Sequence, residues 1–343
     1  MGSKRMCLLS ALVLSVVPML LLSNRTAISR LFSWIDSTDR IVSRNPEKNC
    51  HDSSKRLSRH VDEVCREYQR KGRRSTELRS HQPLNAVFAS QFVIVDDQHQ
   101  MIYCSIPKVA STTFKKLIAQ AVIGDGQRLP CPVHNDTCLE SLGFRILGRM
   151  SSEEIHTKLS NYFKFLIVRH PFVRLLSSYE DKFSRRHHNF LSCEQYRKRV
   201  ELYFDRLRYD REGYPMLNLE QFLEIVAKDR YFRNRHWANY MVTCQPCRIS
   251  YDHVVRLESL WEDAGVVLDR LGYGSDSNRS GMALPHDNRS GLSDKLSRMY
   301  DRLRNINPDI LNRLLTIYGS DLEMFGYSWN NSSIAVSTQR TSC

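Results

Sequence analysis

Short apolar runs alternate with segments of helical periodicity from about residue 88 onward. Residues 92–95, 101–106 and 163–168 have the apolar pattern of strands, and the last of them, FKFLIV, is nearly continuous, as in buried parallel strands. A polar turn and a helix-period segment follow each of the last two strands, at 112–123 and 172–183. Two successive strand–turn–helix units predict an α/β fold in which a parallel sheet is flanked by helices. The same pattern predicts a strand at 253–257 and further helices at 194–208, 219–227, 260–271, 293–304 and 309–318.

Residues 6–23 form an uncharged apolar stretch that follows Lys4 and Arg5. Its length is just sufficient for a helix to span a bilayer. A cleaved signal peptide is the alternative, but no clean cleavage site between small residues follows the stretch. We therefore expect an uncleaved membrane anchor, with residues 1–5 as a cytosolic tail because basic residues favour the cytosolic side. The rest of the chain then lies in the lumen of the secretory pathway.

Residues 24–84 contain many Arg, Lys, Ser and Asp residues and few aromatic ones. This composition is typical of a stem between an anchor and a folded domain. Within it, residues 55–74 form a basic run that predicts a solvated helix. A contact with a polyanion or a membrane is the functional alternative for this run.

The charge balance narrows the kind of partner. The chain has 343 residues and a net charge of +13, which indicates an anionic partner such as a nucleic acid, an acidic membrane or an acidic glycan. A nucleic-acid partner is disfavoured by the anchor and by sequons for N-glycosylation, which agree with a lumenal location. These sequons begin at Asn135, Asn278, Asn288, Asn330 and Asn331.

The number of cysteines also agrees with a lumenal location. The chain has ten cysteines, of which nine follow the anchor, and in an oxidising lumen they predict disulfides. Because nine is odd, at least one thiol is free or bonds to another chain, and Cys343 at the terminus is the candidate. The pair Cys244 and Cys247 has the spacing of half a zinc site or of a redox motif, but no second such pair is present. We interpret it as part of structural disulfides and expect no metal.

The first strand-to-helix junction places a lysine before three hydroxyl residues at a helix start. Backbone N–H groups and hydroxyls of such a loop can surround a phosphate, while Lys108 supplies positive charge. An ordinary capped helix with an exposed lysine is the alternative. The glycine-rich triphosphate loop is absent, so a nucleoside triphosphatase is disfavoured. The residues of this loop are Pro107, Lys108, Val109, Ala110, Ser111, Thr112 and Thr113.

The second junction supplies another anion-binding group. Arg169 ends a strand, Pro171 suits a first helical turn, and Ser177 lies two turns further on. Arginine is well shaped to bind a phosphate through two parallel hydrogen bonds. Since ligands of open α/β sheets bind at the carboxyl ends of strands, the two junctions together predict one site with two phosphate contacts.

The two junctions resemble the nucleotide signatures of sulfotransferases, with a 5′-phosphosulfate loop at 107–115 and a 3′-phosphate site at Arg169 and Ser177. Two later blocks, within 235–263 and at 318–327, resemble one branch of the Golgi carbohydrate sulfotransferases. That branch includes the chondroitin and dermatan 4-O-sulfotransferases, the N-acetylgalactosamine 4-O-sulfotransferases and the killer-cell-epitope glucuronyl sulfotransferase.

The resemblance implies a P-loop-like sulfotransferase fold for residues 85–328, a C-terminal tail at 329–343, and a type II protein of the Golgi membrane. Members of the branch commonly carry Cys-Thr-Asn-Trp where this chain has residues 111–114, Ser-Thr-Thr-Phe. Hydroxyls and an aromatic ring are retained, so the difference bears on the acceptor rather than on the donor.

The donor implied by the resemblance is 3′-phosphoadenosine 5′-phosphosulfate (PAPS), with no obligatory metal. Lys108 is expected to stabilise the bridging oxygen of the departing nucleotide, since charge develops there during in-line transfer. The hydroxyl residues 111–113 then hold the 5′-phosphate, and Arg169 and Ser177 hold the 3′-phosphate.

His236 is the leading candidate for the base that deprotonates the acceptor hydroxyl, because it lies in a family block and imidazole titrates near neutral pH. A packed structural histidine beside Trp237 is the alternative. His170 is expected only to orient the strand end. His187 and His188 either help to hold an anionic acceptor or belong to a solvated loop.

The sequence therefore favours a carbohydrate sulfotransferase that acts on the 4-hydroxyl of N-acetylgalactosamine in chondroitin or dermatan. Sulfation of glucuronic acid or of a terminal N-glycan sugar is the nearest alternative. A lumenal glycan-binding protein without turnover is the alternative from another class, although the intact Lys108, Arg169 and Ser177 argue against it.

Overall fold

A mixed sheet forms the centre of the protein in the computed structural model, which describes residues 47–70, 91–124, 127–183, 191, 193–229, 232–273, 291–327 and 329. The strand order is β3-β1-β2-β4-β7. Strands β2, β4 and β7 are parallel, whereas β1 is antiparallel to both β2 and β3. The bounds are Val93–Asp96 for β1, Met101–Cys104 for β2, Arg145–Ile146 for β3, Phe163–Val168 for β4 and His253–Arg256 for β7.

The prediction of a parallel sheet therefore holds for β2, β4 and β7 and is wrong for β1 and β3 at one edge. The turn of residues 97–100 joins β1 directly to β2, and so short a connection can only make an antiparallel hairpin. The side chain of Asp96 supports this turn by accepting a hydrogen bond from the backbone N–H of His99 at 3.1 Å.

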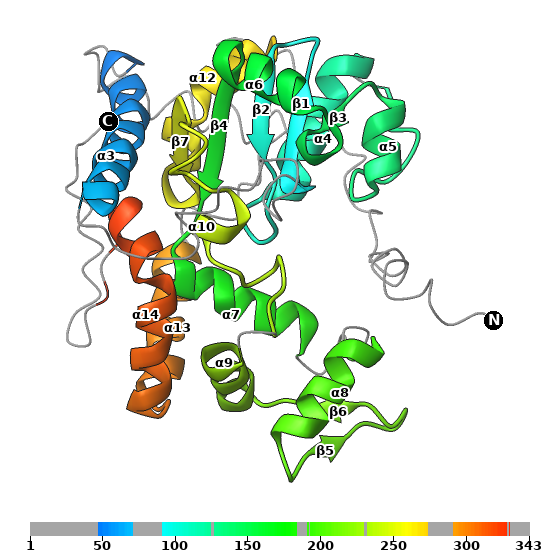
Figure 1. Ribbon diagram of the computed structural model, residues 1–343, viewed down its shortest axis with the longest axis vertical. Helices are drawn as coiled ribbons and strands as arrows, with labels where there is room; N and C mark the ends of the chain where they lie inside the picture. Colours follow the sequence, from blue (N-terminus) through cyan, green and yellow to red (C-terminus); the bar gives the residue numbers. More distant parts are fainter. Residues whose placement is uncertain are drawn as a thin grey trace, which may run out of the picture.

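The two predicted strand–turn–helix units are confirmed. Helix α4 (Ser111–Ile123) follows β2, and helix α7 (Pro171–Lys182) follows β4. Both helices therefore begin at the carboxyl ends of parallel strands, side by side at one edge of the sheet. Figure 1 shows α7 extending from this edge towards the lower part of the molecule.

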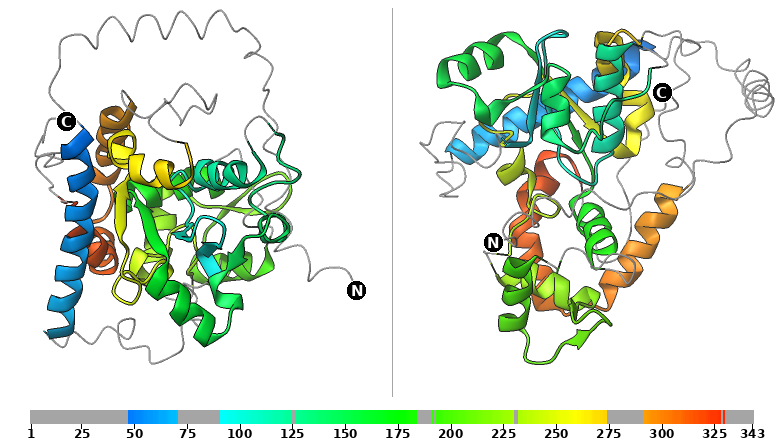
Figure 2. Two further views of the ribbon diagram at one scale, coloured as in Figure 1. Left: turned by 90° about the horizontal axis from the view of Figure 1, so that it is seen from above. Right: turned by 90° about the vertical axis from the view of Figure 1, so that its right-hand side faces the viewer.

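The remaining helices surround the sheet and build a second layer below it (Figures 1 and 2). Their bounds are Glu47–Arg70 for α3, Asp136–Ser141 for α5, Ser152–Asn161 for α6, Glu194–Tyr203 for α8, Leu219–Lys228 for α9, Tyr240–Thr243 for α10, Leu260–Asp263 for α11, Gly265–Arg270 for α12, Gly291–Arg304 for α13 and Pro308–Met324 for α14. A small hairpin of β5 (Arg208–Tyr209) and β6 (Pro215–Met216) follows α8.

Three helix predictions need correction. The helix predicted at 194–208 ends at Tyr203, because the backbone becomes extended at Phe204 and leads into the β5–β6 hairpin. In the turn of this hairpin, the side chain of Asp210 accepts a hydrogen bond from the backbone N–H of Tyr214, and Gly213 has a positive φ. The segment 260–271 forms two short helices rather than one, and the break falls beside Gly265, a poor helix former. The last helix continues to Met324 instead of ending at 318.

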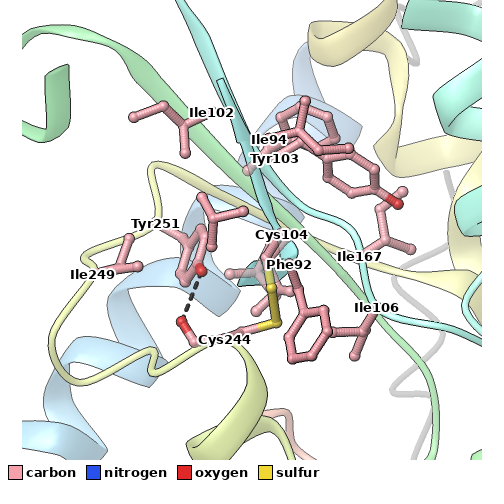
Figure 3. Close-up of a cluster of buried hydrophobic side chains, with 14 of the residues drawn as sticks. Phe92, Ile94, Ile102, Tyr103, Cys104, Ile106, Ile167, Cys244, Ile249 and Tyr251 are labelled. Carbon is pink, nitrogen blue, oxygen red and sulfur yellow. Dashed lines mark hydrogen bonds between the residues drawn. A yellow bond between two sulfur atoms is a disulfide. The ribbon is translucent and has the colours of Figure 1, made fainter. Parts of the chain in front are cut away.

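Two buried clusters form the core. One surrounds the sheet, and the other lies among α7, α9, α13 and α14. Figure 3 shows part of the first cluster, where the Cys104–Cys244 disulfide lies between the side chains of Tyr251 and Phe92. The hydroxyl of Tyr251 donates to the carbonyl of Cys244 at 2.8 Å, which fixes the segment that leads from α10 to β7.

Helix α3 packs against the sheet domain rather than standing in solvent, which corrects the expectation of a solvated helix at 55–74. Its buried side chains Leu57, Val61, Val64 and Tyr68 belong to the core around the sheet. It contacts β7 and α14, and a disulfide joins Cys65 to Cys247. The basic side chains of α3 occupy the outer face of the helix.

The structural interpretation of the cysteine pair is confirmed. Cys244 bonds to Cys104 and Cys247 bonds to Cys65, so the two members of the pair have different partners. A third disulfide joins Cys131 to Cys138. The predicted odd thiol at Cys343 lies outside the described residues.

Among the described residues, no helix has both the length and the apolarity that a membrane span requires. The predicted anchor at 6–23 lies outside them, as do the sequons at Asn278, Asn288, Asn330 and Asn331. The remaining sequon residue, Asn135, caps α5 and accepts from the backbone N–H of Thr137 at 3.0 Å.

Candidate active site

The loop between β2 and α4 has the backbone geometry of an anion-binding turn. Lys108 and Ala110 have positive φ values of 73° and 60°, and buried Val109 between them anchors the loop in the core. Ala110 caps α4 without a side-chain hydrogen bond. The first backbone N–H groups of a helix have no partner within the helix, so those of residues 111–113 are available to an anion.

Lys108 forms an ion pair with a carboxylate from the second junction helix. Its Nζ lies 2.8 Å from Oδ2 of Asp181 on α7, and Lys182 Nζ lies 3.0 Å from the same oxygen. Burial alone would raise the pKa of Asp181, but the hydrogen bonds and charges of Lys108 and Lys182 together outweigh it and lower this pKa to about 2. Burial lowers the pKa of Lys108, and Asp181 opposes that shift. Asp181 is therefore a carboxylate shared by two ammonium groups.

Arg169 lies directly beside the Lys108 loop. One terminal nitrogen of its guanidinium donates to the carbonyl of Lys108 at 3.3 Å, and its backbone N–H donates to the hydroxyl of Tyr240 at 2.8 Å. Its Nε is buried and has no hydrogen-bond partner among the described residues. Burial lowers the pKa of this guanidinium, and the carboxylate of Glu258 opposes that shift. A buried N–H donor without a partner is costly, which is consistent with a site for an anionic ligand.

Two adjacent serines on α7 have different surroundings. Ser177 is half-buried and lies one helical turn before Asp181, so the two share a face of the helix. Ser178 is fully buried, and its hydroxyl, which has one hydrogen to donate, lies 2.6 Å from the carbonyl of His236 and 2.9 Å from that of Arg174. Ser177 thus remains partly accessible on the face of α7 that carries Asp181, whereas Ser178 has a structural role.

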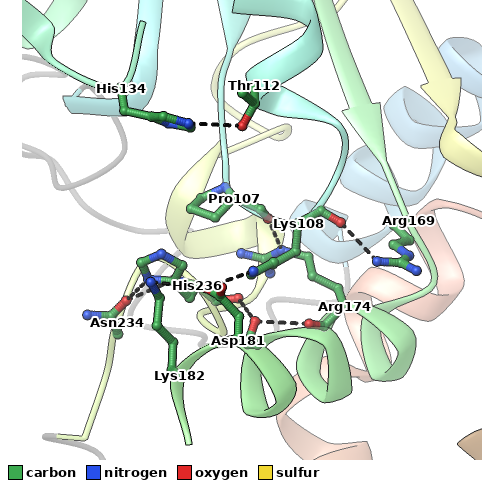
Figure 4. A network of polar contacts seen from close by, with 11 residues as sticks. Pro107, Lys108, Thr112, His134, Arg169, Arg174, Asp181, Lys182, Asn234 and His236 are labelled. Carbon is green, nitrogen blue, oxygen red and sulfur yellow. Dashed lines mark hydrogen bonds and ion pairs between the residues drawn. The ribbon is translucent and has the colours of Figure 1, made fainter. Parts of the chain in front are cut away.

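His236 lies on the other side of Lys108 from Arg169, as Figure 4 shows. Its Nδ1 is 2.6 Å from Oδ1 of Asn234. An amide oxygen only accepts, so Nδ1 carries the proton and Nε2 keeps its lone pair. Burial, followed by the charges of Lys182 and Arg235, lowers the pKa of His236 well below its usual value. The imidazole is therefore neutral at neutral pH and can accept a proton.

The comparisons with known proteins identify the family of this chain. The model of the sulfotransferase family matches residues 91–328, which is more than half of the chain. The chain belongs to the sulfotransferase family. It is 30% identical to carbohydrate sulfotransferase 11 of Mus musculus over 249 residues, which cover 70% of this chain and 68% of that relative. It is 29% identical to carbohydrate sulfotransferase 10 of Homo sapiens over 265 residues, which cover 72% and 70% of the two chains. No solved structure matches the chain significantly.

Membership of this family makes the chain a sulfate-transferring enzyme and implies PAPS as its donor. The described residues of this sulfotransferase fit that donor, which carries two phosphates and a sulfonate. The uncapped start of α4 and its hydroxyl side chains suit the 5′-phosphosulfate. Arg169, with its partnerless Nε, and accessible Ser177 suit the 3′-phosphate. Within the described residues, no group of His, Cys, Asp or Glu side chains is arranged to hold a metal ion.

Several residues of the sulfotransferase site were not predicted from the sequence. The most central is Arg174, which is 1% exposed. Its guanidinium donates to three backbone carbonyls, those of Pro107 at 3.1 Å, Ala238 at 2.6 Å and Arg235 at 2.7 Å. It thereby ties the loop between β2 and α4 to the segment that carries His236. The sequence did offer a signal for its burial, because Arg174 stands between apolar residues on both sides in the predicted helix at 172–183.

A second unpredicted residue is His134, which approaches the site from another loop. Its Nε2 lies 3.3 Å from Oγ1 of Thr112 in the first turn of α4 (Figure 4). The Cys131–Cys138 disulfide closes this loop and holds it in place. Desolvation and the nearby charges of Lys115 and Arg235 lower the pKa of His134.

The other histidines considered in the sequence lie elsewhere. His170 is buried, and its backbone N–H donates to Oε1 of Glu258 at 3.0 Å. The second carboxylate oxygen of Glu258 accepts from the hydroxyl of Tyr327 at 2.6 Å, so the second junction and the terminal block meet at this residue. His187 and His188 lie outside the described residues.

Proposed function

We propose that this sulfotransferase transfers the sulfuryl group of PAPS to a sugar hydroxyl, namely the 4-hydroxyl of N-acetylgalactosamine in chondroitin or dermatan. The observation that carries the proposal is the contact between the two nucleotide signatures, where Arg169 donates to the carbonyl of Lys108. Relatives named carbohydrate sulfotransferases 10, 11, 12 and 14 support a sugar as the acceptor. The resemblance of the blocks at 235–263 and 318–327 supports the chondroitin and dermatan assignment.

The residues of the site divide the work of binding the donor and activating the acceptor. When bound, PAPS supplies an activated sulfuryl group and a nucleotide leaving group. The N–H and hydroxyl groups of residues 111–113 hold the 5′-phosphate, while Arg169 and Ser177 hold the 3′-phosphate. Lys108 provides the positive charge that stabilises the bridging oxygen, which requires its ammonium to share or leave Asp181. Nε2 of His236 takes the proton of the acceptor hydroxyl.

We also propose that the protein is a type II protein of the Golgi membrane with its catalytic domain in the lumen. The apolar stretch at 6–23 supports an anchor. The three disulfides of the described residues support a lumenal domain, because disulfides persist in oxidising compartments.

Transfer of radiolabelled sulfate by the purified full chain in detergent tests the function. PAPS is offered with a panel of acceptors: desulfated chondroitin, dermatan, heparan and N-glycans carrying terminal N-acetylgalactosamine. Disaccharide analysis then locates the label. Label on the 4-hydroxyl of N-acetylgalactosamine in chondroitin or dermatan supports the proposal in full. Label on glucuronic acid or on an N-glycan would overturn the acceptor, and no label with the donor still bound would favour a glycan-binding protein without turnover.

A further inference from the structure

The chain leaves the sheet at the end of β4, and the residue that follows this strand is Arg169. Beyond a strand end, backbone N–H and C=O groups need hydrogen-bond partners outside the sheet. At Arg169 one side-chain oxygen serves both groups. The backbone N–H of Arg169 donates to the hydroxyl of Tyr240 at 2.8 Å, and this hydroxyl donates to the backbone carbonyl of Arg169 at 3.2 Å. A hydroxyl can make both bonds at once, because it has lone pairs and one hydrogen.

Tyr240 is itself held in place by its surroundings. It is fully buried at the start of α10, and its backbone N–H lies 3.0 and 2.9 Å from the two carboxylate oxygens of buried Asp321 on α14. Its ring packs edge-on against Phe325, with 4.9 Å between the ring centroids, and Cζ of Arg174 lies 5.1 Å from its centroid. Burial raises the pKa of the Tyr240 hydroxyl, so at neutral pH it keeps the hydrogen that it donates to Arg169. The position of this hydroxyl is therefore set by the packing of α10 and α14.

A fixed backbone limits where the side chain of Arg169 can reach. Because its N–H and C=O groups are both bonded, its backbone dihedral angles are restrained, and these angles decide which side-chain rotamers are allowed. One terminal nitrogen of the guanidinium donates to the carbonyl of Lys108 at 3.3 Å (Figure 4), and Nε is buried without a hydrogen-bond partner among the described residues. A guanidinium binds a phosphate through two parallel hydrogen bonds only when its plane is correctly oriented. Orienting it in advance also reduces the entropy lost on binding.

We propose that Tyr240 is a positioning residue for the 3′-phosphate of the donor: its hydroxyl fixes the backbone of Arg169 and thereby orients the guanidinium that binds this phosphate. The inference rests on the proposed function, in which Arg169 holds the 3′-phosphate, and it adds a residue that lies outside both nucleotide signatures. Because Tyr240 acts through Arg169, its effect is confined to ligands that carry a 3′-phosphate. A tyrosine that only stabilised the fold would affect all nucleotides of the site alike.

The test removes the hydroxyl of Tyr240 and keeps the ring. Tyr240→Phe is compared with Tyr251→Phe, each in the full chain in detergent. Tyr251 is the matched control, because it is also buried and its hydroxyl donates to a different backbone carbonyl, that of Cys244, at 2.8 Å. Titration calorimetry measures the binding of 3′-phosphoadenosine 5′-phosphate and of adenosine 5′-phosphate, which lacks only the 3′-phosphate. Urea unfolding measures the stability of each variant.

Arg169→Ala supplies a background in which the guanidinium is absent. Tyr240→Phe is introduced into this background as well, which completes a double-mutant cycle. If the hydroxyl acts through Arg169, its removal has no further effect on the binding of 3′-phosphoadenosine 5′-phosphate in this background.

We expect Tyr240→Phe to weaken the binding of 3′-phosphoadenosine 5′-phosphate about fivefold, the size of the effect of one lost hydrogen bond. KM for PAPS should rise by a similar factor, with little change in kcat. The affinity for adenosine 5′-phosphate should stay at the wild-type value. Tyr251→Phe should lose a similar amount of stability and bind both nucleotides as the wild-type chain does.

Three outcomes for Tyr240→Phe would overturn the role of this residue: an equal loss of affinity for both nucleotides, wild-type affinity for both, or the same fivefold loss in the Arg169→Ala background. In each of them the effect of Arg169→Ala, and with it the proposed donor site, still stands. If Arg169→Ala binds 3′-phosphoadenosine 5′-phosphate as tightly as the wild-type chain, or if the wild-type chain does not bind it, the proposed donor site and the role of Tyr240 fail together.

Discussion

The ammonium of Lys108 lies 2.8 Å from the carboxylate of Asp181, which joins the loop after β2 to the helix after β4. Lys108 lies in the segment that resembles the first nucleotide signature, and Asp181 lies on the helix of the second. The ion pair fixes the position of the ammonium group of Lys108, the proposed catalytic lysine. The lysine has to exchange this partner, wholly or in part, for the donor.

Replacing Lys108 tests its catalytic role. Lys108→Ala should lower kcat by about 10²- to 10³-fold, because removal of a group that stabilises developing charge has effects of this size. The melting temperature should change little, since Asp181 keeps Lys182 as a partner. Lys116→Ala, which removes an exposed lysine of α4, serves as the control. Near-normal turnover of Lys108→Ala would contradict the assignment.

Arg169 is predicted to act through donor affinity. Arg169→Ala should weaken binding of 3′-phosphoadenosine 5′-phosphate about tenfold or more, because a charge-assisted bidentate contact is lost. Titration calorimetry measures this directly. The control Arg211→Ala removes an exposed arginine of the β5–β6 turn. Unchanged affinity in Arg169→Ala would place the 3′-phosphate elsewhere.

The adjacent serines of α7 make a matched pair. Ser178→Ala should lower the free energy of unfolding by about 1–3 kcal/mol, because the buried carbonyl of His236 loses its donor. Ser177→Ala should leave stability unchanged and weaken donor binding, since its hydroxyl is partly accessible and is proposed to hold the 3′-phosphate. Urea unfolding and calorimetry on both variants distinguish the two roles. A reversed pattern would show that the serines had been assigned the wrong way round.

The lowered pKa of His236 predicts the pH dependence of both activity and stability. Activity should stay on its plateau as pH falls through 6.5 and decline only at lower pH, where the imidazole becomes protonated. Below pH 6.5 the unfolded chain binds a proton that the folded chain resists, so stability should fall as pH decreases from 6.5 towards the folded pKa. His236→Gln should remove this part of the slope. An activity decline centred at pH 6.5 would argue against a neutral buried His236.

The disulfide between α3 and the 244–247 segment should contribute to global stability. Cys65→Ser with Cys247→Ser opens a link between residues 182 positions apart, and a loss of about 2–4 kcal/mol is expected. The pair Cys131→Ser and Cys138→Ser, only 7 positions apart, should cost less. Chemical unfolding of both double variants gives the comparison. An equal effect would mean that α3 is held by its apolar contacts alone.

The parts of the structure predicted well are those set by local pattern. The strands at 101 and 163 and the helices after them have strong periodicity and defined starts, so their bounds came within about two residues. The burial of α3 was missed although Leu57, Val61, Val64 and Tyr68 follow a helical stripe. The many basic residues of the segment 55–74 led to the prediction of a solvated helix.

The candidate site was predicted only where a motif marks it. Lys108, Arg169 and Ser177 lie at recognisable spacings in the two junctions. Asp181 and His134 do not, because their roles depend on which segments the fold brings together. The carboxylate of Asp181, one turn beyond Ser177, can be recognised as a partner of Lys108 only once the fold places the Lys108 loop against α7.

Buried Arg174 also bears on how the protein can diversify. All three of its acceptors are backbone carbonyls, so changes in the side chains at 107, 235 and 238 leave its hydrogen bonds in place. Evolution can therefore vary the side chains at these positions while the loop between β2 and α4 keeps its place. The reverse does not hold: no single replacement at 174 preserves three such bonds, so related enzymes with new specificities are expected to vary around this arginine rather than at it.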